Sequence, residues 1–205
     1  MFYKILKAIV RPIFFGLYRI KIIGKKNSNY SGKMIIFSNH LSNLDPIFMH
    51  LIVKQKVYFM AKAELFKNPF LKWLITSLGA FPVSRGTGDM EAIKSAFKIL
   101  KRGDTLGIFP EGTRSKTGEM GPFQSGTAVI ALRTKTPLLP VYIHGKLKIF
   151  RRNYITIGHP IDLFTGAEIA NASDTGAAKK GADYLKKRME ELELLTKAVI
   201  TEAKR

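Results

Sequence analysis

The fold class of this chain is decided by the stretch Met34-Ile35-Ile36-Phe37-Ser38-Asn39-His40-Leu41-Ser42-Asn43-Leu44-Asp45-Pro46. Its first five residues form a short apolar run, which is typical of a strand buried on both faces of a sheet. Pro46 suits the first turn of a helix, where its missing N–H is not needed. The stretch is therefore predicted to be a strand-to-helix junction.

The same alternation continues along the chain, with no internal repeat and no interdomain linker. Strands are expected at 34–38, 57–60, 81–84, 105–109, 138–143 and 154–157, and helices at 45–54, 69–77, 89–101, 123–134 and from 178 to the end. The Gly/Ala/Ser-rich segment 161–178 is expected to be a surface loop. In the last helix, a core stripe is expected at Leu185, Met189, Leu192, Leu195 and Val199. This pattern predicts an α/β fold.

Composition and charge narrow the class of protein. The 205 residues suit a single domain, and 46% hydrophobic residues exclude a disordered polycation. Lys and Arg number 34 against 15 Asp and Glu, a formal net charge of +19, so an acidic partner is expected: nucleic acid, an anionic membrane or a phosphorylated substrate. The chain has no cysteine, which excludes disulfides, thiolate metal sites and a cysteine nucleophile.

The N-terminal segment 1–30 is basic and amphipathic. No acidic residue precedes Asp45. A helical projection gathers Phe2, Ile5, Leu6, Ile9, Ile13 and Leu17 on one side, and Lys4, Lys7 and Arg11 on the other. Because charges interrupt the segment too often for a bilayer span, we expect it to lie on a membrane without crossing it. The alternative is a first helix that packs on its own domain and leaves a solvated basic face.

The junction after the first strand also carries candidate chemistry. A neutral imidazole at His40 can accept a proton from a hydroxyl, and a carboxylate at Asp45 can fix its tautomer if the residues between them turn. The alternative reading makes Asp45 a helix N-cap and His40 an ordinary loop histidine.

Three further clusters follow apolar runs. Gly79 to Gly86 contains Arg85, and Phe109-Pro110-Glu111-Gly112-Thr113-Arg114-Ser115 contains Arg114; an arginine suits a phosphate, although either could be an exposed loop residue. Gly112 frees the backbone to approach a ligand. The stretch Pro137 to Ile143 is mostly apolar and alone would pass for an edge strand.

Together, in this order and spacing, the four clusters resemble the motifs of the 1-acyl-glycerol-3-phosphate acyltransferases, within the glycerolipid acyltransferase superfamily. The resemblance covers about 34–160. His40 and Asp45 match the His-x4-Asp element, and Phe109 to Ser115 match Phe-Pro-Glu-Gly-Thr-Arg-Ser residue for residue. The resemblance implies a central mixed sheet wrapped by helices, with an acyltransferase domain at 31–205 behind the N-terminal membrane-docking segment.

The reaction implied is transfer of a fatty acyl group from an acyl thioester, acyl-CoA or acyl carrier protein, to the sn-2 hydroxyl of lysophosphatidic acid, which gives phosphatidic acid. By resemblance His40 and Asp45 are catalytic, and the substrate-binding residues are Lys62, Arg85, Glu111, Gly112, Thr113 and Arg114. Glu111 is expected to organise either the acceptor glycerol or the loop itself. The backbone around Gly112 is a candidate for stabilising the thioester oxyanion. No metal and no cofactor are expected.

One position departs from the family pattern, because Gln124 stands where the family has a lysine. The open alternatives are another acceptor (glycerol 3-phosphate, another lysophospholipid or a lyso-aminolipid) and, from another class, a non-catalytic basic module that binds membranes or nucleic acid. A surface base is the alternative for Lys62, and an acyl-enzyme on Ser42 is the alternative chemistry. Nucleic acid is not expected as a partner, because aromatic residues fall mostly within apolar runs. The expected location is the cytoplasmic face of the cell membrane, peripheral or monotopic.

Overall fold

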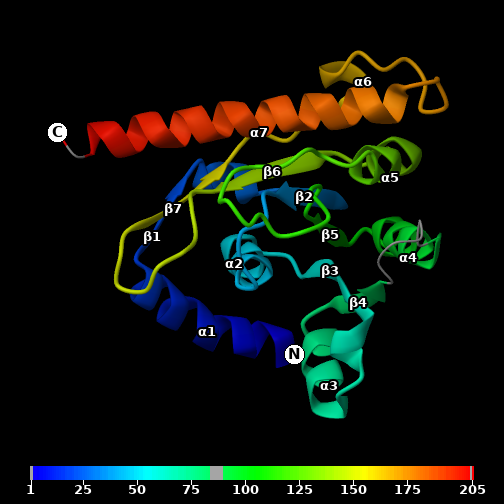
Figure 1. The fold of residues 1–205 in the computed structure, drawn as a ribbon. Helices are drawn as coiled ribbons and strands as arrows, with labels where there is room; N and C mark the ends of the chain where they lie inside the picture. The colour runs from blue at the N-terminus through cyan, green and yellow to red at the C-terminus, as the bar shows by residue number, and fades with distance from the viewer. Residues whose placement is uncertain (1, 84–89, 204) are drawn as a thin grey trace.

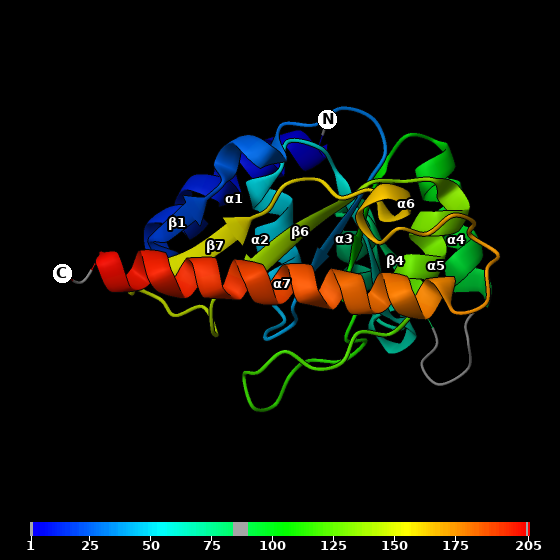
Figure 2. The same cartoon turned by 90° about the horizontal axis from the view of Figure 1, so that it is seen from above.

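The computed structural model describes residues 2–83, 90–203 and 205. Within them, seven strands form one sheet with helices on both of its faces (Figures 1 and 2). The strands are β1 (Ile20–Ile23), β2 (Met34–Ser38), β3 (Val57–Lys62), β4 (Ala80–Val83), β5 (Thr105–Ile108), β6 (Leu138–Ile143) and β7 (Asn153–Ile157). The α-helices are α1 (Phe2–Tyr18), α2 (Asp45–Ile52), α3 (Pro69–Ser77), α4 (Met90–Lys101), α5 (Gly126–Thr134), α6 (Leu163–Gly166) and α7 (Ala177–Glu202), and two short 3-10 helices are η1 (Lys25–Ser28) and η2 (Ala63–Phe66).

The sheet is mixed, in the order β1-β7-β6-β2-β5-β3-β4. Strands β6, β2, β5, β3 and β4 run parallel, whereas β7 is antiparallel to β6 and β1 is parallel to β7. The predicted mixed sheet wrapped by helices is confirmed. Because five neighbouring strands share one direction, they all end at one side of the sheet, which we call the carboxyl edge; β7 and β1 begin there.

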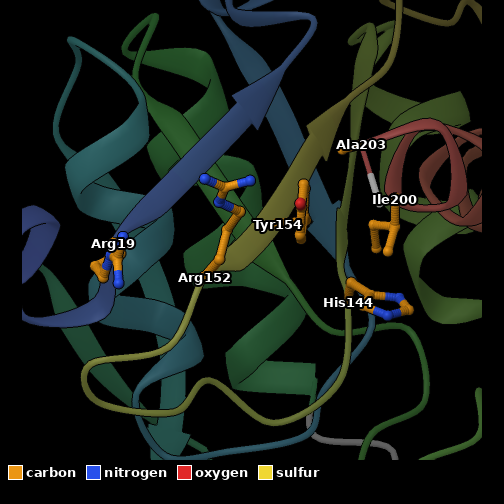
Figure 3. A pocket seen from close by; sticks show the side chains of 6 residues that line it. All are labelled: Arg19, His144, Arg152, Tyr154, Ile200 and Ala203. Atoms are coloured by element: carbon orange, nitrogen blue, oxygen red, sulfur yellow. The ribbon is translucent and has the colours of Figure 1, made fainter. Parts of the chain in front are cut away.

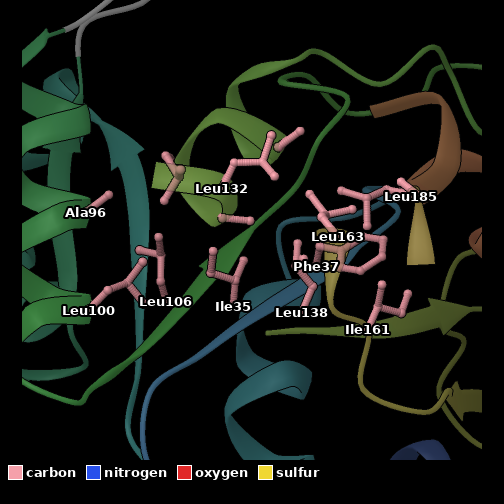
Figure 4. Packing of buried hydrophobic residues seen from close by; sticks show 14 of the residues in the cluster. Ile35, Phe37, Ala96, Leu100, Leu106, Leu132, Leu138, Ile161, Leu163 and Leu185 are labelled. Carbon is pink, nitrogen blue, oxygen red and sulfur yellow. The ribbon is translucent and has the colours of Figure 1, made fainter. Parts of the chain in front are cut away.

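Helices cover both faces of the sheet, so the side chains of strand β2 are buried on both sides. Its alternate residues Ile35 and Phe37 pack with α4, α5 and α7 in one hydrophobic cluster (Figure 4). Met34 and Ile36 point the other way, toward α1 and α2. All four side chains are buried, so the strand is apolar throughout and does not alternate. Residues of α2 are buried in the second cluster as well, so β2 and α2 fix the junction that carries His40 at both of its ends.

Strand β1 was not predicted from the sequence. It pairs with β7, from Ile20 opposite Asn153 to Ile23 opposite Thr156. The segment 1–30 thus contains a strand of the central sheet as well as a helix. Its three isoleucines are only partly buried at the sheet edge, and the exposed Lys21 interrupts them, so their hydrophobic signal is weak.

The expectation of a surface loop at 161–178 is wrong for 161–169 and is confirmed for 170–176. Ile161, Leu163 and Ile169 are buried in the main cluster, and Ile161 forms a bridge with Leu138. Asp162 accepts hydrogen bonds from the N–H groups of Phe164 and Thr165 and so caps the short helix α6. The small residues allow close packing here, and the acidic residues that suggested a loop lie on the outside.

Helix α1 packs on the domain and keeps an exposed apolar stripe. Leu6, Val10 and Phe14 line an apolar cavity of about 220 Å³ against α2, while Ile5, Ile9 and Ile13 are each about half exposed. Lys7 was expected on the basic side of this helix; its Nζ donates to the carbonyls of Val53 and Lys54, which directly follow α2. No helix in the described part of the chain is long and apolar enough to span a bilayer.

Candidate active site

His40 and Asp45 are in contact at the carboxyl edge of the sheet. His40 follows β2, and Asp45 is the first residue of α2. The imidazole Nδ1 lies 2.9 Å from Asp45 Oδ2. The four intervening residues turn tightly, since the Asp45 N–H donates to the Ser42 carbonyl at 3.3 Å. The contact that the spacing permitted is therefore formed.

The Asp45 carboxylate is held by the loop that precedes it. The N–H groups of Leu41 and Ser42 each donate to Oδ2 at 2.6 Å. The side chain of Asp45 is fully buried, whereas that of His40 keeps 16% of its surface exposed. The N-cap of α2 is Leu44, which makes no side-chain cap bond, so Asp45 does not act as the N-cap. Its position at the first helical residue still places a negative charge at the positive end of the helix dipole.

This arrangement determines which nitrogen of His40 can act as a base. An ionised carboxylate only accepts hydrogen bonds, so Nδ1 carries the proton and donates it to Asp45. Nε2 then keeps its lone pair. The ring is also fixed in direction because it stacks on Phe109, with centroids 4.0 Å apart and planes 18° from parallel. A partly exposed, oriented imidazole with a buried carboxylate partner is suited to accept a proton from a bound hydroxyl.

Glu111 connects the second loop of the site to His40. Its Oε1 accepts the His40 backbone N–H at 2.8 Å, and its Oε2 accepts the Gly121 N–H at 3.0 Å. The Ser115 N–H donates to the His40 carbonyl at 2.8 Å. Of the two roles expected for Glu111, the geometry supports organisation of the loop.

Gly112 makes the turn in this loop possible. Its φ is +71°, and a Cβ at this position would lie 2.5 Å from Gln124 Nε2. Its N–H donates to the Phe109 carbonyl at 3.0 Å, so this N–H is already engaged and not directed at a substrate oxygen. Gln124 also donates to the Glu111 carbonyl at 3.4 Å. The residue that departs from the family pattern thus supports the loop.

The other predicted residues that the structure describes lie along the carboxyl edge. Thr113 and Arg114 line a cavity of about 480 Å³ formed by residues 111–124, together with Glu111. Lys62 ends β3, is half exposed, and its Nζ pairs with Glu64 Oε1 at 3.0 Å. Arg85 lies outside the residues that the structure describes. Ser42 Oγ accepts the Leu44 N–H at 3.1 Å and so takes part in the turn.

A second cavity at the same edge was missed by the sequence analysis. It measures about 500 Å³ and is lined by Arg19, His144 and Arg152, with Tyr154, Ile200 and Ala203 (Figure 3). Arg19 precedes β1, Arg152 precedes β7, and His144 follows β6, so all three belong to the carboxyl edge. The parallel pairing of β1 with β7 brings the two arginines to the same edge, and without β1 this placement could not be predicted.

Comparisons with known proteins identify the family and support the fold. The sequence model of the Acyltransferase family matches residues 19–144. The chain is 31% identical over 180 residues to the 1-acyl-sn-glycerol-3-phosphate acyltransferase of Bacillus subtilis, covering 85% of this chain and 88% of that protein. It is 33% identical over 138 residues to the chloroplastic enzyme BAT2 of Brassica napus, which covers 66% of this chain and only 40% of the longer plant protein. The crystal structure of the 1-acyl-sn-glycerophosphate (LPA) acyltransferase PlsC from Thermotoga maritima superposes with a TM-score of 0.72 at 25% identity, over 94% of this chain and 78% of that one.

Proposed function

This chain belongs to the acyltransferase family, and we propose from that premise that it transfers a fatty acyl group from an acyl thioester to the sn-2 hydroxyl of 1-acyl-glycerol 3-phosphate. The product is phosphatidic acid, a precursor of phospholipids. The observation that carries the proposal is the contact between His40 Nδ1 and the buried carboxylate of Asp45. The acceptor is inferred from the similar proteins of Bacillus subtilis and Thermotoga maritima, both of which are named as acyltransferases of 1-acyl-glycerol phosphate.

The chemistry needs one base and no covalent enzyme intermediate. Nε2 of His40 accepts the proton of the acceptor hydroxyl as its oxygen attacks the thioester carbonyl. The imidazolium formed is stabilised by Asp45 across the 2.9 Å contact. When the C–S bond breaks, the departing thiolate takes the proton back from Nε2. A thioester already has a good leaving group, so an acyl-enzyme on Ser42 is not required.

A phosphate-bearing acceptor fits the charge of the edge. We assign Arg114, with Thr113, to the acceptor phosphate, because both line the cavity next to Glu111. Arg85 and Lys62 are proposed to add charge at the same edge. The acyl donor, acyl-CoA or acyl carrier protein, is acidic in either case and would be attracted by the +19 chain.

We propose that the enzyme works on the cytoplasmic face of the cell membrane, as a peripheral or monotopic protein. The acceptor is a lipid, and α1 exposes Ile5, Ile9 and Ile13 along one side. Apolar residues in such a stripe on a basic protein favour the surface of an anionic bilayer.

The test is acyl transfer from a labelled acyl thioester to lysophosphatidic acid in detergent, comparing the wild type with His40→Ala. Removing the base is expected to lower kcat by roughly 100-fold to 10,000-fold. Circular dichroism of the variant checks that it is folded. Glycerol 3-phosphate, other lysophospholipids and lyso-aminolipids are offered in parallel.

Each outcome has a distinct meaning. Phosphatidic acid made by the wild type and lost in His40→Ala supports both reaction and base. Activity on another acceptor alone would keep the mechanism and change the substrate. Full activity without the imidazole would contradict the mechanism, and no transfer with any donor or acceptor would favour the non-catalytic binding module.

A further inference from the structure

Helix α3 (Pro69–Ser77) is apolar yet contributes nothing to the core. Its sequence is Pro-Phe-Leu-Lys-Trp-Leu-Ile-Thr-Ser, and none of its residues is buried. The same holds for η2, which precedes it. The helix is well defined, since the Asn68 side chain accepts the Leu71 N–H at 3.0 Å and Pro69 occupies the first turn. A formed helix with this composition, left outside the core, requires an explanation.

The most exposed large side chains of this region form one patch. Phe70 is 72% exposed, Trp73 is 55% exposed, and their ring centroids lie 6.2 Å apart on successive turns. Leu65, on η2, is 44% exposed. We call Leu65, Phe70 and Trp73 the α3 patch. Large aromatic residues grouped on a surface in this way indicate an interaction site.

The α3 patch lies on the side of the sheet that also carries α1. Both helices stand opposite α7 in Figure 1. They adjoin, because Leu78 at the end of α3 lines the same apolar cavity as Leu6 and Val10 of α1. Helix α1 exposes its own stripe of three isoleucines. The two helices that carry these exposed apolar side chains therefore lie on one side of the molecule.

The charge around these surfaces favours a lipid bilayer over a second copy of the chain as the binding partner. Lys67 and Lys72 are exposed beside the α3 patch. Lysine next to aromatic side chains suits the headgroup layer, where the ring enters the interface and the ammonium reaches outward. A second copy of the chain would bring another net charge of +19 against the first, which disfavours that occupant.

We propose that the α3 patch inserts into the interface of an anionic lipid bilayer as a second contact beside α1. This inference rests on the proposed function, in which the acceptor is a membrane lipid. One helix alone leaves the protein free to rotate about that helix, whereas two contacts fix its orientation. The carboxyl edge with His40 then meets the lipid surface at a fixed angle.

Trp73 is the only tryptophan of the chain, so wild-type tryptophan fluorescence reports on the patch alone. We would measure emission with phosphatidylglycerol vesicles, with and without bromine on the acyl chains. The expected result is a shift to shorter wavelength and quenching by bromine near the interface. Unchanged emission from protein that co-sediments with the vesicles would overturn the proposal, as would failure to bind these vesicles. The same shift without lipid, on raising protein concentration, would assign the patch to a second copy and also overturn it.

Matched variants separate insertion from general effects on the surface. Leu65→Ser is compared with Leu195→Ser on α7, on the opposite side of the sheet; the two leucines are 44% and 47% exposed. Leu65→Ser is expected to weaken vesicle partition by about tenfold, and Leu195→Ser to leave it unchanged. Phe70→Ser tests the aromatic half of the patch in the same way. Equal partition of all three variants and the wild type would contradict the inference.

These readouts do not depend on catalysis, so the two proposals can fail separately. A protein that inserts Trp73 but makes no phosphatidic acid would refute the proposed function and keep the α3 contact. A protein that makes phosphatidic acid in detergent but shows no change at Trp73 on vesicles would refute the α3 contact alone.

Discussion

Asp45 makes His40 a directed base, and its effect can be tested by a single isosteric change. In Asp45→Asn the amide oxygen can still accept from the N–H groups of Leu41 and Ser42, so the turn is retained. The negative charge that stabilises the imidazolium is lost. We expect kcat to fall by roughly 100-fold or more, with little change in the urea midpoint. Activity within a few-fold of the wild type would show that the carboxylate only supports the loop.

Gly107 has no side chain and so leaves space for the aromatic residues that pack next to His40. A Cβ on Gly107 would lie 2.1 Å from the ring of Phe59, far inside contact distance. Phe59 packs on Phe109 with centroids 5.9 Å apart, and Phe109 stacks on the imidazole. Gly107→Ala is therefore expected to cost about 1–3 kcal/mol of stability and to lower kcat by disturbing the ring of His40.

The control for this change is Gly126→Ala, where a Cβ meets nothing within 4 Å. It should leave both kcat and the denaturation midpoint close to those of the wild type. If Gly107→Ala loses stability but keeps full kcat, the aromatic stack does not position the base.

Sequence patterns predicted the His40–Asp45 contact but not what holds it. The five-residue separation required a turn, and the strand-to-helix junction supplies one. The sequence could not decide whether Glu111 contacts the substrate or organises the loop. Two of its partners are backbone N–H groups, which almost every residue type has. Such bonds leave no trace in the sequence. Arg85 lies outside the described residues, and its role stays a prediction.

At the scale of elements, α1 and α2 are joined by a histidine that stays neutral when buried. Tyr3 OH lies 3.2 Å from Nδ1 of His50, and His50 also packs on Phe59. Burial, with the charges of Lys7 and Lys56, lowers the pKa of His50 to about 3. The unfolded chain binds a proton at His50 near the ordinary pKa of 6.5, so its contribution to stability is complete above pH 6.5 and is lost as the pH falls toward 3.

We therefore expect His50→Gln to flatten the acid side of the stability profile. At pH 5 the proton uptake of unfolded His50 costs on the order of 1–2 kcal/mol, which the variant avoids. Urea denaturation of both proteins at pH 5 and pH 8 measures this. Between pH 8 and pH 5, the free energy of unfolding should fall by more in the wild type than in the variant. The same difference at both pH values would show that His50 is not responsible.

Helices and strands with a regular spacing of apolar residues could be predicted from the sequence. Features that depend on contacts with residues far away in the sequence could not. The helix expected from 178 begins at Ala177 in α7, but its stripe is partly wrong: Leu195 is exposed and Thr196 is buried. The Thr196 hydroxyl bonds Thr156 at 2.6 Å, so a polar residue occupies a core position that a search for apolar residues omits. Helix α5 begins at Gly126 and not at 123, because the preceding residues belong to the loop around Glu111.

At the scale of the whole molecule, charge and apolar surface are divided between different parts of the first helix. A cavity of about 630 Å³ between α1, η1 and the end of α2 has a lining rich in basic residues: Lys4, Lys7, Arg11, Lys25, Lys26 and Lys54. The isoleucine stripe of α1 is a separate, uncharged surface. Electrostatic attraction to a membrane is screened by salt, whereas burial of apolar side chains is not.

The two contributions predict a salt dependence with two parts. Raising the salt from 0.15 M to 1 M shortens the Debye length from about 8 Å to about 3 Å, so binding to phosphatidylglycerol vesicles should fall steeply and then level off above zero. The remaining binding is assigned to exposed apolar side chains, those of the stripe and of the α3 patch, and Ile9→Ser should reduce this high-salt level by about tenfold while leaving the slope at low salt unchanged. Leu194→Ser, an exposed leucine on α7, is the control and should change neither part. Co-sedimentation across the salt range measures both. If binding fell to zero at high salt in the wild type, charge alone would hold the protein at the membrane, and neither the stripe nor the α3 patch would contribute.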